Sequence, residues 1–419
     1  MKVVLLNTAE RNGGAAVAAN RLLKALSTIP DMEVTMLVRD KATDDPQVVS
    51  VNTTACKQWL NKLRFVWERG LIFLANRFNR RGLFQVSIAN TGTDVSKLPV
   101  VREADIIHLH WINHGFLSLR DLRKLQRLGK PIVWTLHDLW PATGICHYPD
   151  TCTRYRTLCD ICPQMAATPL LPLSRRVFKQ KMRLDLSHTA FVGCSRWITD
   201  RAQTSGLLRQ ACFHAIPNPI DGAVFHPIDR SEAQQRFLLP TDRPIVLFAA
   251  AKVSDTRKGI KYLIDACHLL YRQGLPSFDV ALLGGQPEGL AASFPCRVHS
   301  LGYLSAPEDI RAAYACASVF VIPSLEDNLP NTVMEALACG SPCVGFRTGG
   351  IPEMIDHMQN GYIARYQDAQ DLADGIAWVL NHPEPEALSN ACVQKVNRSY
   401  RQEIVARQYH TLYENLLRK

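Results

Sequence analysis

Short runs of β-branched and other apolar residues alternate with amphipathic helical patterns along almost the whole chain. The runs are continuously apolar, which is typical of strands buried on both faces of a parallel sheet. We predict strands at residues 2–7, 33–38, 105–110, 131–137, 190–194, 244–249, 280–284, 297–301, 319–322, 342–345 and 362–365. We predict helices at residues 15–26, 117–128, 260–273, 308–316, 332–339 and 371–380. This order of elements predicts an α/β fold of doubly wound parallel sheets.

The alternation restarts after residues 216–229, IPNPIDGAVFHPID, which carry three prolines and read as a linker. A chain of 419 residues is too long for one ordinary core, so two domains are expected. We predict a Rossmann-like domain at 1–216, a second at 217–399, and a final helix at about 400–419 that packs back on the first. Ligands of such sheets bind outside the carboxyl ends of the strands. The predicted site is therefore a central cleft that the two domains face.

The composition excludes some classes of protein. Its 47% hydrophobic and 21% charged content is that of a globular protein, and no run reaches the roughly eighteen apolar residues of a membrane-spanning helix. The first residues, MKVVLLN, are too short in their apolar part for a signal peptide, so we expect a cytoplasmic protein. The net charge of +10 indicates an anionic partner. Charge alone leaves open a phosphorylated ligand, a membrane surface or a nucleic acid.

Residues 323–342, PSLEDNLPNTVMEALACGSP, place two acids around an uncharged turn. The turn follows a predicted strand and leads into a helix, whose first backbone N–H groups can donate to ligand oxygens. Asp327 and Glu335 can accept hydrogen bonds from hydroxyls, so the arrangement suits a sugar and a ribose. The alternative is structural: Thr332 and Glu335 fit a capping box, and Asp327 is then a solvated turn residue. Spacing alone leaves both interpretations open.

Residues 249–266, AAAKVSDTRKGIKYLIDA, carry cations between a strand and a helix. Arg257 and Lys258 lie at the predicted helix N-terminus, where positive charge opposes the helix dipole. Together with the helix amides they suit a diphosphate, and Lys252 is a candidate third cation. The alternative is that these are exposed charges that keep the chain soluble.

Two weaker signals come from the predicted first domain. Gly13 and Gly14, between the first strand and helix, allow a ligand to approach the backbone closely, although neither G-x-G-x-x-G nor G-x-x-x-x-G-K-[ST] occurs in the chain. His137 ends an apolar strand, where it can hydrogen-bond a substrate hydroxyl. His108 and His110 end the neighbouring strand and are weaker candidates, because a lone histidine is more often structural.

Residues 57–81, KQWLNKLRFVWERGLIFLANRFNRR, carry seven Lys or Arg and one acid. Aromatic residues interleave with these charges at Trp59, Phe65, Trp67, Phe73 and Phe78. A basic amphipathic helix with aromatics on one face suits an anionic membrane surface. The alternative is a helix that packs its aromatics on the first domain.

Four of the 13 cysteines cluster with C-x5-C-x6-C-x2-C spacing. They are Cys146, Cys152, Cys159 and Cys162. In a reducing compartment such a cluster is compatible with a structural tetrahedral zinc ion, with reduced structural thiols, or with a redox or disulfide role. The spacing leaves these three interpretations open, and it offers no open ligand position for a catalytic metal.

Taken together, PSLEDNLPNTVMEALACGSPCVGF, the loop RKG, the linker IPNPIDGAVFHP and the glycine loop resemble the family 4 glycosyltransferases of the GT-B fold. Members of that family are retaining enzymes that use nucleotide-activated sugars. The segment HDLWPATGICHYPDTCTRYRTLCDICP resembles the branch of the family that builds bacterial exopolysaccharides and capsules. The resemblance extends over nearly the whole chain, and its most specific part is the C-terminal motif.

The resemblance implies roles for the acids of the C-terminal motif. Asp327 and Glu335 match the two acids of the family's E-x7-E pattern. Glu335 would hold the nucleotide ribose, and Asp327, with the backbone of Asn328, Leu329 and Pro330, would hold the hydroxyls of the donor sugar. Two departures leave the donor's identity open: the first acid is Asp rather than Glu, and Asn-Leu-Pro replaces the commoner Gly-Phe-Gly.

The resemblance also implies that Lys258, with Lys252 or Arg257, binds the diphosphate and that His137 lies beside the donor sugar near the reacting carbon. Gly13 and Gly14 complete the implied nucleotide-sugar-binding set. The implied catalytic residues are His137, Lys258 and Asp327. No Asp-x-Asp lies near the implied phosphate site, so lysine and helix amides would replace a catalytic metal, and no cofactor is required for catalysis.

The sequence therefore predicts a retaining, metal-independent hexosyltransferase. It would move a sugar from a nucleotide-diphosphate sugar to a saccharide acceptor, which we expect to be lipid-linked, in surface-polysaccharide biosynthesis. Attachment through 57–81 would place it on the inner face of the cytoplasmic membrane. One alternative is a nucleotide-sugar epimerase or phosphorylase-like enzyme on the same fold. The other is a non-catalytic nucleic-acid-binding protein with a zinc loop. The acids of the implied site argue against it, so no nucleic acid is expected as a partner.

Overall fold

The computed structural model describes residues 1–166, 168–274, 277–285 and 289–418. The chain divides into two compact units. The first unit is formed by Met1–Asn218 with Val405–Lys419, and the second by Pro219–Ile404. The boundaries thus fall at 218/219 and 404/405, whereas the sequence predicts 216/217 and 399/400.

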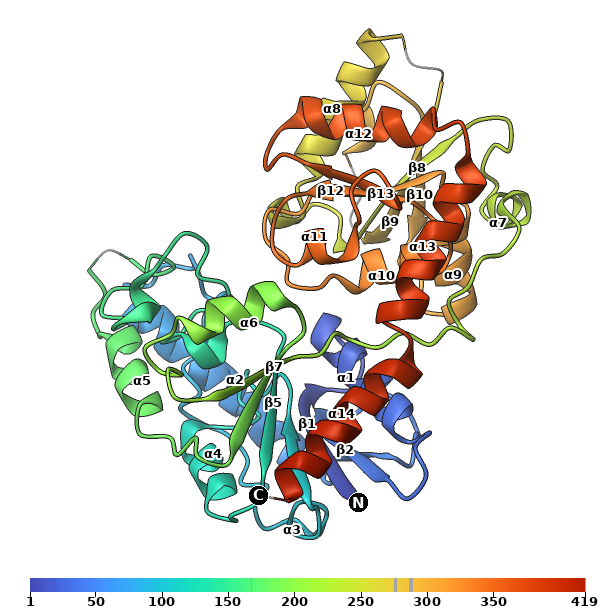
Figure 1. Ribbon diagram of the computed structural model, residues 1–419. Coiled ribbons are helices and arrows are strands. Elements are labelled where there is room, and N and C mark those ends of the chain that lie inside the picture. The colour runs from blue at the N-terminus through green and yellow to red at the C-terminus, as the bar shows by residue number, and fades with distance from the viewer. Residues whose placement is uncertain (167, 275–276, 286–288, 419) are drawn as a thin grey trace. The chain divides into compact units, whose positions relative to one another are not determined.

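The first unit is built on a seven-stranded parallel sheet with the order β3-β2-β1-β4-β5-β6-β7 (Figure 1). Its strands are β1 (Lys2–Ala9), β2 (Glu33–Asp40), β3 (Val48–Ser50), β4 (Ile106–Leu109), β5 (Ile132–Leu136), β6 (Thr189–Gly193) and β7 (Cys212–Ala215). Its helices are α1 (Gly14–Leu26), α2 (Ala55–Ala75), α3 (Pro99–Arg102), α4 (Leu119–Gln126), α5 (Leu173–Lys181), α6 (Arg196–Gln203) and most of α14 (Gln402–Leu417). The two outermost strands, β3 and β7, are absent from the prediction.

Successive residues of β1 point to opposite faces of this sheet, and both faces are buried. Val4 and Leu6 belong to one hydrophobic cluster, and Val3 and Leu5 to another. The second cluster includes residues of α1 and also Tyr409 of α14, so the end of the chain covers this face. A continuous apolar run such as 2–7 is what burial on both faces requires.

The second unit is built on a six-stranded parallel sheet with the order β10-β9-β8-β11-β12-β13 (Figure 1). Its strands are β8 (Ile245–Lys252), β9 (Asp279–Gly285), β10 (Val298–Gly302), β11 (Val319–Ile322), β12 (Cys343–Phe346) and β13 (Gly361–Ala364). Its helices are α7 (Arg230–Arg236), α8 (Ile260–Arg272), α9 (Pro307–Ala315), α10 (Asn331–Ala338), α11 (Ile351–Met354), α12 (Ala369–Leu380) and α13 (Pro385–Ser399). Residues of α8 and α12 share one hydrophobic cluster with β8 and β11.

Each sheet has one point at which the strand order changes direction along the chain. In the first unit it lies between β1 and β4, and in the second between β8 and β11. The prediction of doubly wound parallel sheets is confirmed. Ligands of such sheets bind at the carboxyl ends of the strands beside this switch point. We therefore expect a site in the loops that follow these strands.

The structure of residues 57–81 differs from the predicted basic amphipathic helix. Helix α2 begins at Ala55 and ends at Ala75, so the last arginines of the segment lie beyond it. The aromatics do not share one face. Trp59 and Trp67 are 63% and 61% exposed, whereas Phe65 and Phe73 are half-buried. Within the described residues, the structure contains no helix long and apolar enough to span a membrane.

Candidate functional site

The loops that follow β8 and β11 meet beside the switch point of the second unit. Lys258 Nζ lies 2.6 Å from Asp327 Oδ2. The two side chains are only 23% and 12% exposed, so solvent screens this ion pair less than it screens a surface pair. Ser324 Oγ lies 3.4 Å from the same carboxylate oxygen. The structure therefore brings together two residues that the sequence assigns to one site.

Backbone contacts hold these two loops against each other. Leu325 N donates to Arg257 O at 2.9 Å, and Arg257 Nη1 donates to Glu326 O at 3.2 Å. Lys258 ends a 3₁₀ turn that precedes α8, and Gly259 follows it with a φ of 72°. A Cβ on Gly259 would lie 1.9 Å from Pro323 O. Glycine is therefore required here both for the left-handed backbone and for the close approach of the second loop.

A third loop, which follows β12, closes on Asp327 from another side. Gly350 N donates to Asp327 O at 3.3 Å. Gly349 has a φ of 58°, and a Cβ there would lie 1.6 Å from the same oxygen. Thr348 Oγ1 donates to Leu325 O at 3.2 Å. The acid is thus fixed by the ends of three strands, which suits a preorganised binding group.

Helix α10 begins at Asn331, and Pro330 precedes it without a side-chain hydrogen bond to the helix. The capping-box interpretation of Thr332 and Glu335 is wrong, because Thr332 is already inside the helix. Pro330 has no N–H, so it cannot donate to a sugar hydroxyl as the sequence interpretation assumed for this turn. Asn328 and Leu329 are both buried.

The other predicted residues of the second unit have different surroundings. Glu335 is in the second turn of α10 and is 8% exposed. Lys252 is the exposed last residue of β8. Arg257 forms a weaker ion pair with Asp255, at 3.8 Å. Of the described residues, Asp327 is the ion-pair partner of Lys258, and neither Lys252 nor Glu335 takes part in that pair.

In the first unit, three neighbouring strand ends bring uncharged groups together. His137 follows β5, and its Nε2 lies 2.9 Å from His110 Nδ1, which follows β4. Cys194 follows β6, and its Sγ lies 3.6 Å from His137 Nδ1. Burial lowers the pKa of His137 to about 4, against a smaller opposite effect of Asp138. Burial also lowers the pKa of His110, and this cluster is therefore neutral near pH 7.

His108 has a structural role. Its Nδ1 lies 2.7 Å from Tyr413 Oη and its Nε2 lies 2.7 Å from Thr135 Oγ1. Thr135 Oγ1 in turn lies 3.0 Å from Tyr409 Oη. These contacts tie β4 and β5 to α14. His110, which the sequence analysis treated like His108, contacts His137 instead. The two histidines differ because His108 lies within β4, whereas His110 follows the end of that strand.

The glycine loop of the first unit lies at its switch point. Gly13 precedes α1 and Gly14 is the first residue of that helix, and both are exposed. The ends of β1 and β4 are joined beside it, since Thr8 N donates to Trp111 O at 2.8 Å. The His137 imidazole contacts His110 and Cys194, and the glycine loop follows the end of β1.

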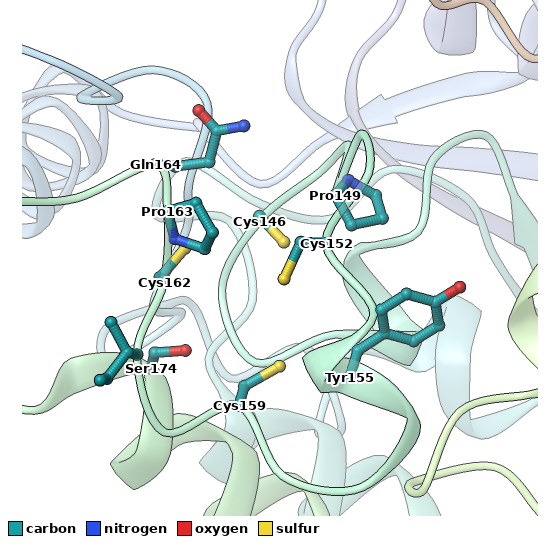
Figure 2. A pocket seen from close by; sticks show the side chains of 10 residues that line it. Cys146, Pro149, Cys152, Tyr155, Cys159, Cys162, Pro163, Gln164 and Ser174 are labelled. Atoms are coloured by element: carbon teal, nitrogen blue, oxygen red, sulfur yellow. The ribbon is translucent and has the colours of Figure 1, made fainter.

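The four clustered cysteines line one small cavity in the loop between β5 and α5 (Figure 2). All four are free thiols. Among the described residues, no three Cys, His, Asp or Glu side chains stand close enough to hold a metal ion as they lie. The structure therefore brings the predicted set together without closing a coordination sphere.

Comparison with known families assigns both units. Residues 12–223 match the family model described as Glycosyltransferase Family 4, and residues 243–382 match the model described as Glycosyl transferases group 1. The first match covers half of the chain. The first match includes the ends of β4, β5 and β6, and the second includes those of β8, β11 and β12.

The chain is similar to a curated protein and to solved structures. It is 30% identical over 190 residues to the amylovoran biosynthesis glycosyltransferase AmsK of Erwinia amylovora, which is 42% of this chain and 46% of AmsK. The chain matches the curated relatives over roughly a third to a half of their length. The sucrose-phosphate synthase of Thermosynechococcus elongatus has a TM-score of 0.68 at 18% identity, with 99% of each chain covered.

A second solved structure is the Anabaena protein HepE in complex with UDP, with a TM-score of 0.63 at 15% identity, covering 99% of this chain and 100% of HepE. At these identities the likeness concerns the fold alone. It confirms the predicted GT-B fold, in which each half of the chain is a Rossmann-like domain.

Proposed function

The chain belongs to the family 4 glycosyltransferases, and on this premise we propose that it moves a sugar from a nucleotide-diphosphate sugar to a saccharide acceptor with retention of configuration. We propose that this transfer builds a bacterial surface polysaccharide. Two comparisons support the proposal: the name of AmsK refers to amylovoran biosynthesis, and HepE was solved with UDP. The observation that carries it within this chain is the ion pair of Lys258 and Asp327 at the switch point of the second unit.

This ion pair suits a diphosphate sugar for an electrostatic reason. Asp327 holds the Lys258 ammonium in a partly buried place without ligand. A diphosphate carries more negative charge than one carboxylate and offers several acceptor oxygens, so it can take over the ammonium. The carboxylate is then released to accept hydrogen bonds from sugar hydroxyls. One pair therefore serves both the phosphate and the sugar.

The same arrangement suits the chemistry of transfer. Breaking the sugar–phosphate bond leaves an oxocarbenium-like carbon and a negatively charged diphosphate. Lys258, with Arg257 beside it, stabilises the leaving group as its charge develops. Attack by the acceptor on the same face of the sugar then gives retention. We propose that these cations make a catalytic divalent ion unnecessary, so transfer is expected to proceed without added Mg²⁺.

His137 is proposed to contact a substrate hydroxyl from the first unit. Its imidazole is neutral near pH 7 because burial lowers its pKa to about 4. A neutral imidazole can donate from one nitrogen and accept at the other. His110 contacts Nε2 at 2.9 Å and Cys194 contacts Nδ1 at 3.6 Å, so a substrate hydroxyl would replace the longer thiol contact at Nδ1. We therefore assign His137 an orienting role toward a hydroxyl rather than a charged one.

A panel of nucleoside diphosphates and nucleotide sugars, tested by thermal unfolding of the full chain, checks the proposal. A cognate ligand at 100 times its Kd should stabilise the folded state by about 2.7 kcal/mol. Incubation of the stabilising nucleotide sugar with and without saccharide acceptors then separates transfer from acceptor-independent chemistry. If no member of the panel raises the unfolding temperature, the proposed donor class is wrong.

Helix α2 supports a proposal about a membrane partner, because its polarity is inverted. The face that packs on the first unit contains Asn61, Glu68, Arg69, Ile72 and Ala75. The outer face exposes the apolar side chains of Trp59, Leu60, Leu63, Val66, Trp67 and Leu74. Glu68 Oε1 accepts from the N–H groups of Ile88 and Ala89 at 2.8 and 2.9 Å, so polar contacts anchor the helix. An apolar outer stripe is costly in water.

Basic residues accompany this stripe: Lys57 and Lys62 are exposed on the helix, and Arg77, Arg80 and Arg81 are exposed just after it. We propose that α2 binds an anionic membrane surface on its cytoplasmic side, where a lipid-linked acceptor would be available. Vesicles containing phosphatidylglycerol should sediment the protein, and the double variant Trp59→Gln/Trp67→Gln should stay in solution. Leu238→Gln, which changes a 91% exposed residue of the second unit, is the matched control. Failure of the unmodified chain to sediment would refute the membrane assignment.

A further inference from the structure

The long connection between β5 and α5 has little regular structure to hold it. Its helical content consists of the 3₁₀ turns Trp140–Ala142 and Arg154–Arg156. Residues near its two ends, among them Cys146 and Cys162, belong to the main hydrophobic cluster of the first unit. Between them, Tyr155 and Cys159 form a small cluster with Phe178 of α5, against which Leu158 and Leu207 pack. A stretch with so small a core of its own gains stability from a further constraint.

The four cysteines of this connection face one cavity from different turns. Figure 2 shows the sulfur atoms of Cys146, Cys152, Cys159 and Cys162 on the sides of the cavity that face one another. The cavity is small, about 10 Å³, which is roughly the room that one water-sized sphere needs. It can therefore accept a single ion and is too small for an organic ligand.

We propose that one structural zinc ion is bound by Cys146, Cys152, Cys159 and Cys162 and cross-links the turns of this connection. Four sulfur donors are a complete tetrahedral set for Zn²⁺, which leaves no position for substrate. Binding releases the thiol protons to solvent, because the thiolate is the ligand. The proposal concerns the first unit alone and does not depend on the transferase reaction.

The surroundings of the thiols suit the negative charge of a zinc tetrathiolate. Gly144 N donates to Cys159 Sγ at 3.3 Å, as backbone amides do around metal-bound sulfur. Lys181 of α5 is buried, and its ammonium donates to Thr143 O at 3.0 Å. Thr143 Oγ1 in turn donates to Cys146 O, so the ammonium lies beside the cysteine loop. A buried ammonium needs nearby negative charge, and thiolates around a zinc ion would supply it.

Coordination requires the thiols to move closer together than they lie, since the described side chains do not form a closed set. The cysteines stand on turns whose hydrogen bonds are local, such as Cys152 N to Pro149 O at 2.8 Å and Met165 N to Cys162 O at 3.0 Å. We propose that rotation of the side chains and an inward shift of these turns accompany binding of the ion.

The zinc cross-link would also stabilise the conformation of the segment around His137. His147 is next to Cys146, and its Nδ1 lies 2.7 Å from Asp138 Oδ2. Trp111 Nε1 donates to the same oxygen at 2.8 Å. Asp138 directly follows His137 in the chain. Fixing Cys146 therefore fixes the neighbour of a residue that we place at the substrate.

Zinc analysis of the full chain, purified under reducing conditions without chelator, tests the proposal. We expect one zinc ion per chain by mass spectrometry, and less than about 0.1 per chain in Cys152→Ser and Cys159→Ser. Cys212→Ser is the matched control, because Cys212 is an exposed cysteine of β7 outside the cluster, and it should keep the ion. Replacement by Co²⁺ should give the visible spectrum of a tetrahedral thiolate site.

The unmodified chain provides a second readout if the serine variants fail to fold. Stripping the ion with a strong chelator should lower the unfolding temperature, and Zn²⁺ alone should restore it. Counting free thiols in the denatured chain separates the rival interpretations. Metal-free protein with 13 reactive thiols, or with disulfides among the four cysteines, would overturn the zinc proposal, as would zinc that persists in both serine variants.

Discussion

In the second unit a charged pair lies at the ends of the strands, whereas in the first unit two neutral, buried histidines and a thiol lie there. Lys258 and Asp327 face each other at 2.6 Å beside the switch point of β8 and β11. His137, His110 and Cys194 lie together at the ends of β4, β5 and β6. The two sheets have the same doubly wound architecture, so the difference lies in the loops rather than in the fold.

The difference teaches which part of a substrate each unit suits. Fixed positive charge next to a carboxylate suits a ligand that is anionic at one end and rich in hydroxyls at the other. Neutral imidazoles can orient hydroxyls but cannot balance a diphosphate. We therefore assign phosphate binding to the second unit.

The largest expected effect is that of Lys258→Ala. Because it removes the cation that faces the leaving group, we expect the rate of transfer to fall by about 10²–10³. The fold should stay intact, although the unfolding temperature should fall because the largely buried Asp327 carboxylate loses its ion-pair partner. Lys261→Ala is the matched control: Lys261 is on α8, its side chain is 80% exposed, and it pairs with Asp265 at 3.4 Å. Near-normal turnover in Lys258→Ala would remove phosphate binding from this unit.

The next effect is that of Asp327→Asn, which should separate phosphate binding from sugar binding. The variant no longer holds Lys258 by charge, so a nucleoside diphosphate should bind at least as tightly as it does to the unmodified chain. Transfer should fall by about 10², because an amide replaces the acceptor for sugar hydroxyls. Calorimetric titration and initial rates measure the two quantities. Weaker binding of the diphosphate would show that Asp327 has another role.

The buried histidines of the first unit predict a dependence of stability on pH. Burial lowers the pKa of His108 to about 3 and that of His137 to about 4. Below about pH 6.5 the unfolded chain binds protons that the folded chain excludes, so the free energy of unfolding should decrease as pH falls from 6.5 toward 4. Each such histidine contributes a slope of about 1.4 kcal/mol per pH unit.

Denaturant unfolding of the full chain at a series of pH values measures this slope, and His108→Gln should reduce it by one histidine's share. If the variant does not fold, imidazole signals followed by NMR give the same information. Protonation of His108 in the folded chain above pH 5 would contradict the neutral character that we assign to this unit.

The smallest expected effect on transfer is that of His137→Asn. An asparagine keeps one polar contact, so we expect about a tenfold loss, the equivalent of one hydrogen bond of about 1.4 kcal/mol. Affinity for a nucleoside diphosphate should stay unchanged, because the phosphate site is in the second unit. A loss of diphosphate affinity would contradict the division between the two units.

The fold was predictable where strands are long runs of apolar residues. Strand β11 has its predicted bounds because Val319–Ile322 is fully buried and followed by a proline. Strand β7 escaped prediction because Cys212–Ala215 is an edge strand with exposed and half-buried residues. Strand β3 has only three residues. These two edge strands lack the continuous apolar run that reveals a central strand, whereas the edge strands β10 and β13 of the second unit were predicted at 297–301 and 362–365.

The candidate site was predictable in its residues but not in their pairing. Lys258 and Asp327 are 69 residues apart in the sequence, and His110 and His137 are 27 apart. A local pattern places each of them at a strand end, and only the order of strands in the sheet decides which ends are neighbours. The capping box at Thr332 failed for another reason: α10 begins at Asn331, two residues before the first helical position that a cap at Thr332 would give.

The most direct test of the account is a crystal structure of the full chain with a bound nucleoside diphosphate. The account predicts phosphate oxygens at hydrogen-bond distance from Lys258 Nζ, with Asp327 turned toward the sugar side of the ligand. A diphosphate bound elsewhere, with Lys258 still paired to Asp327, would contradict it.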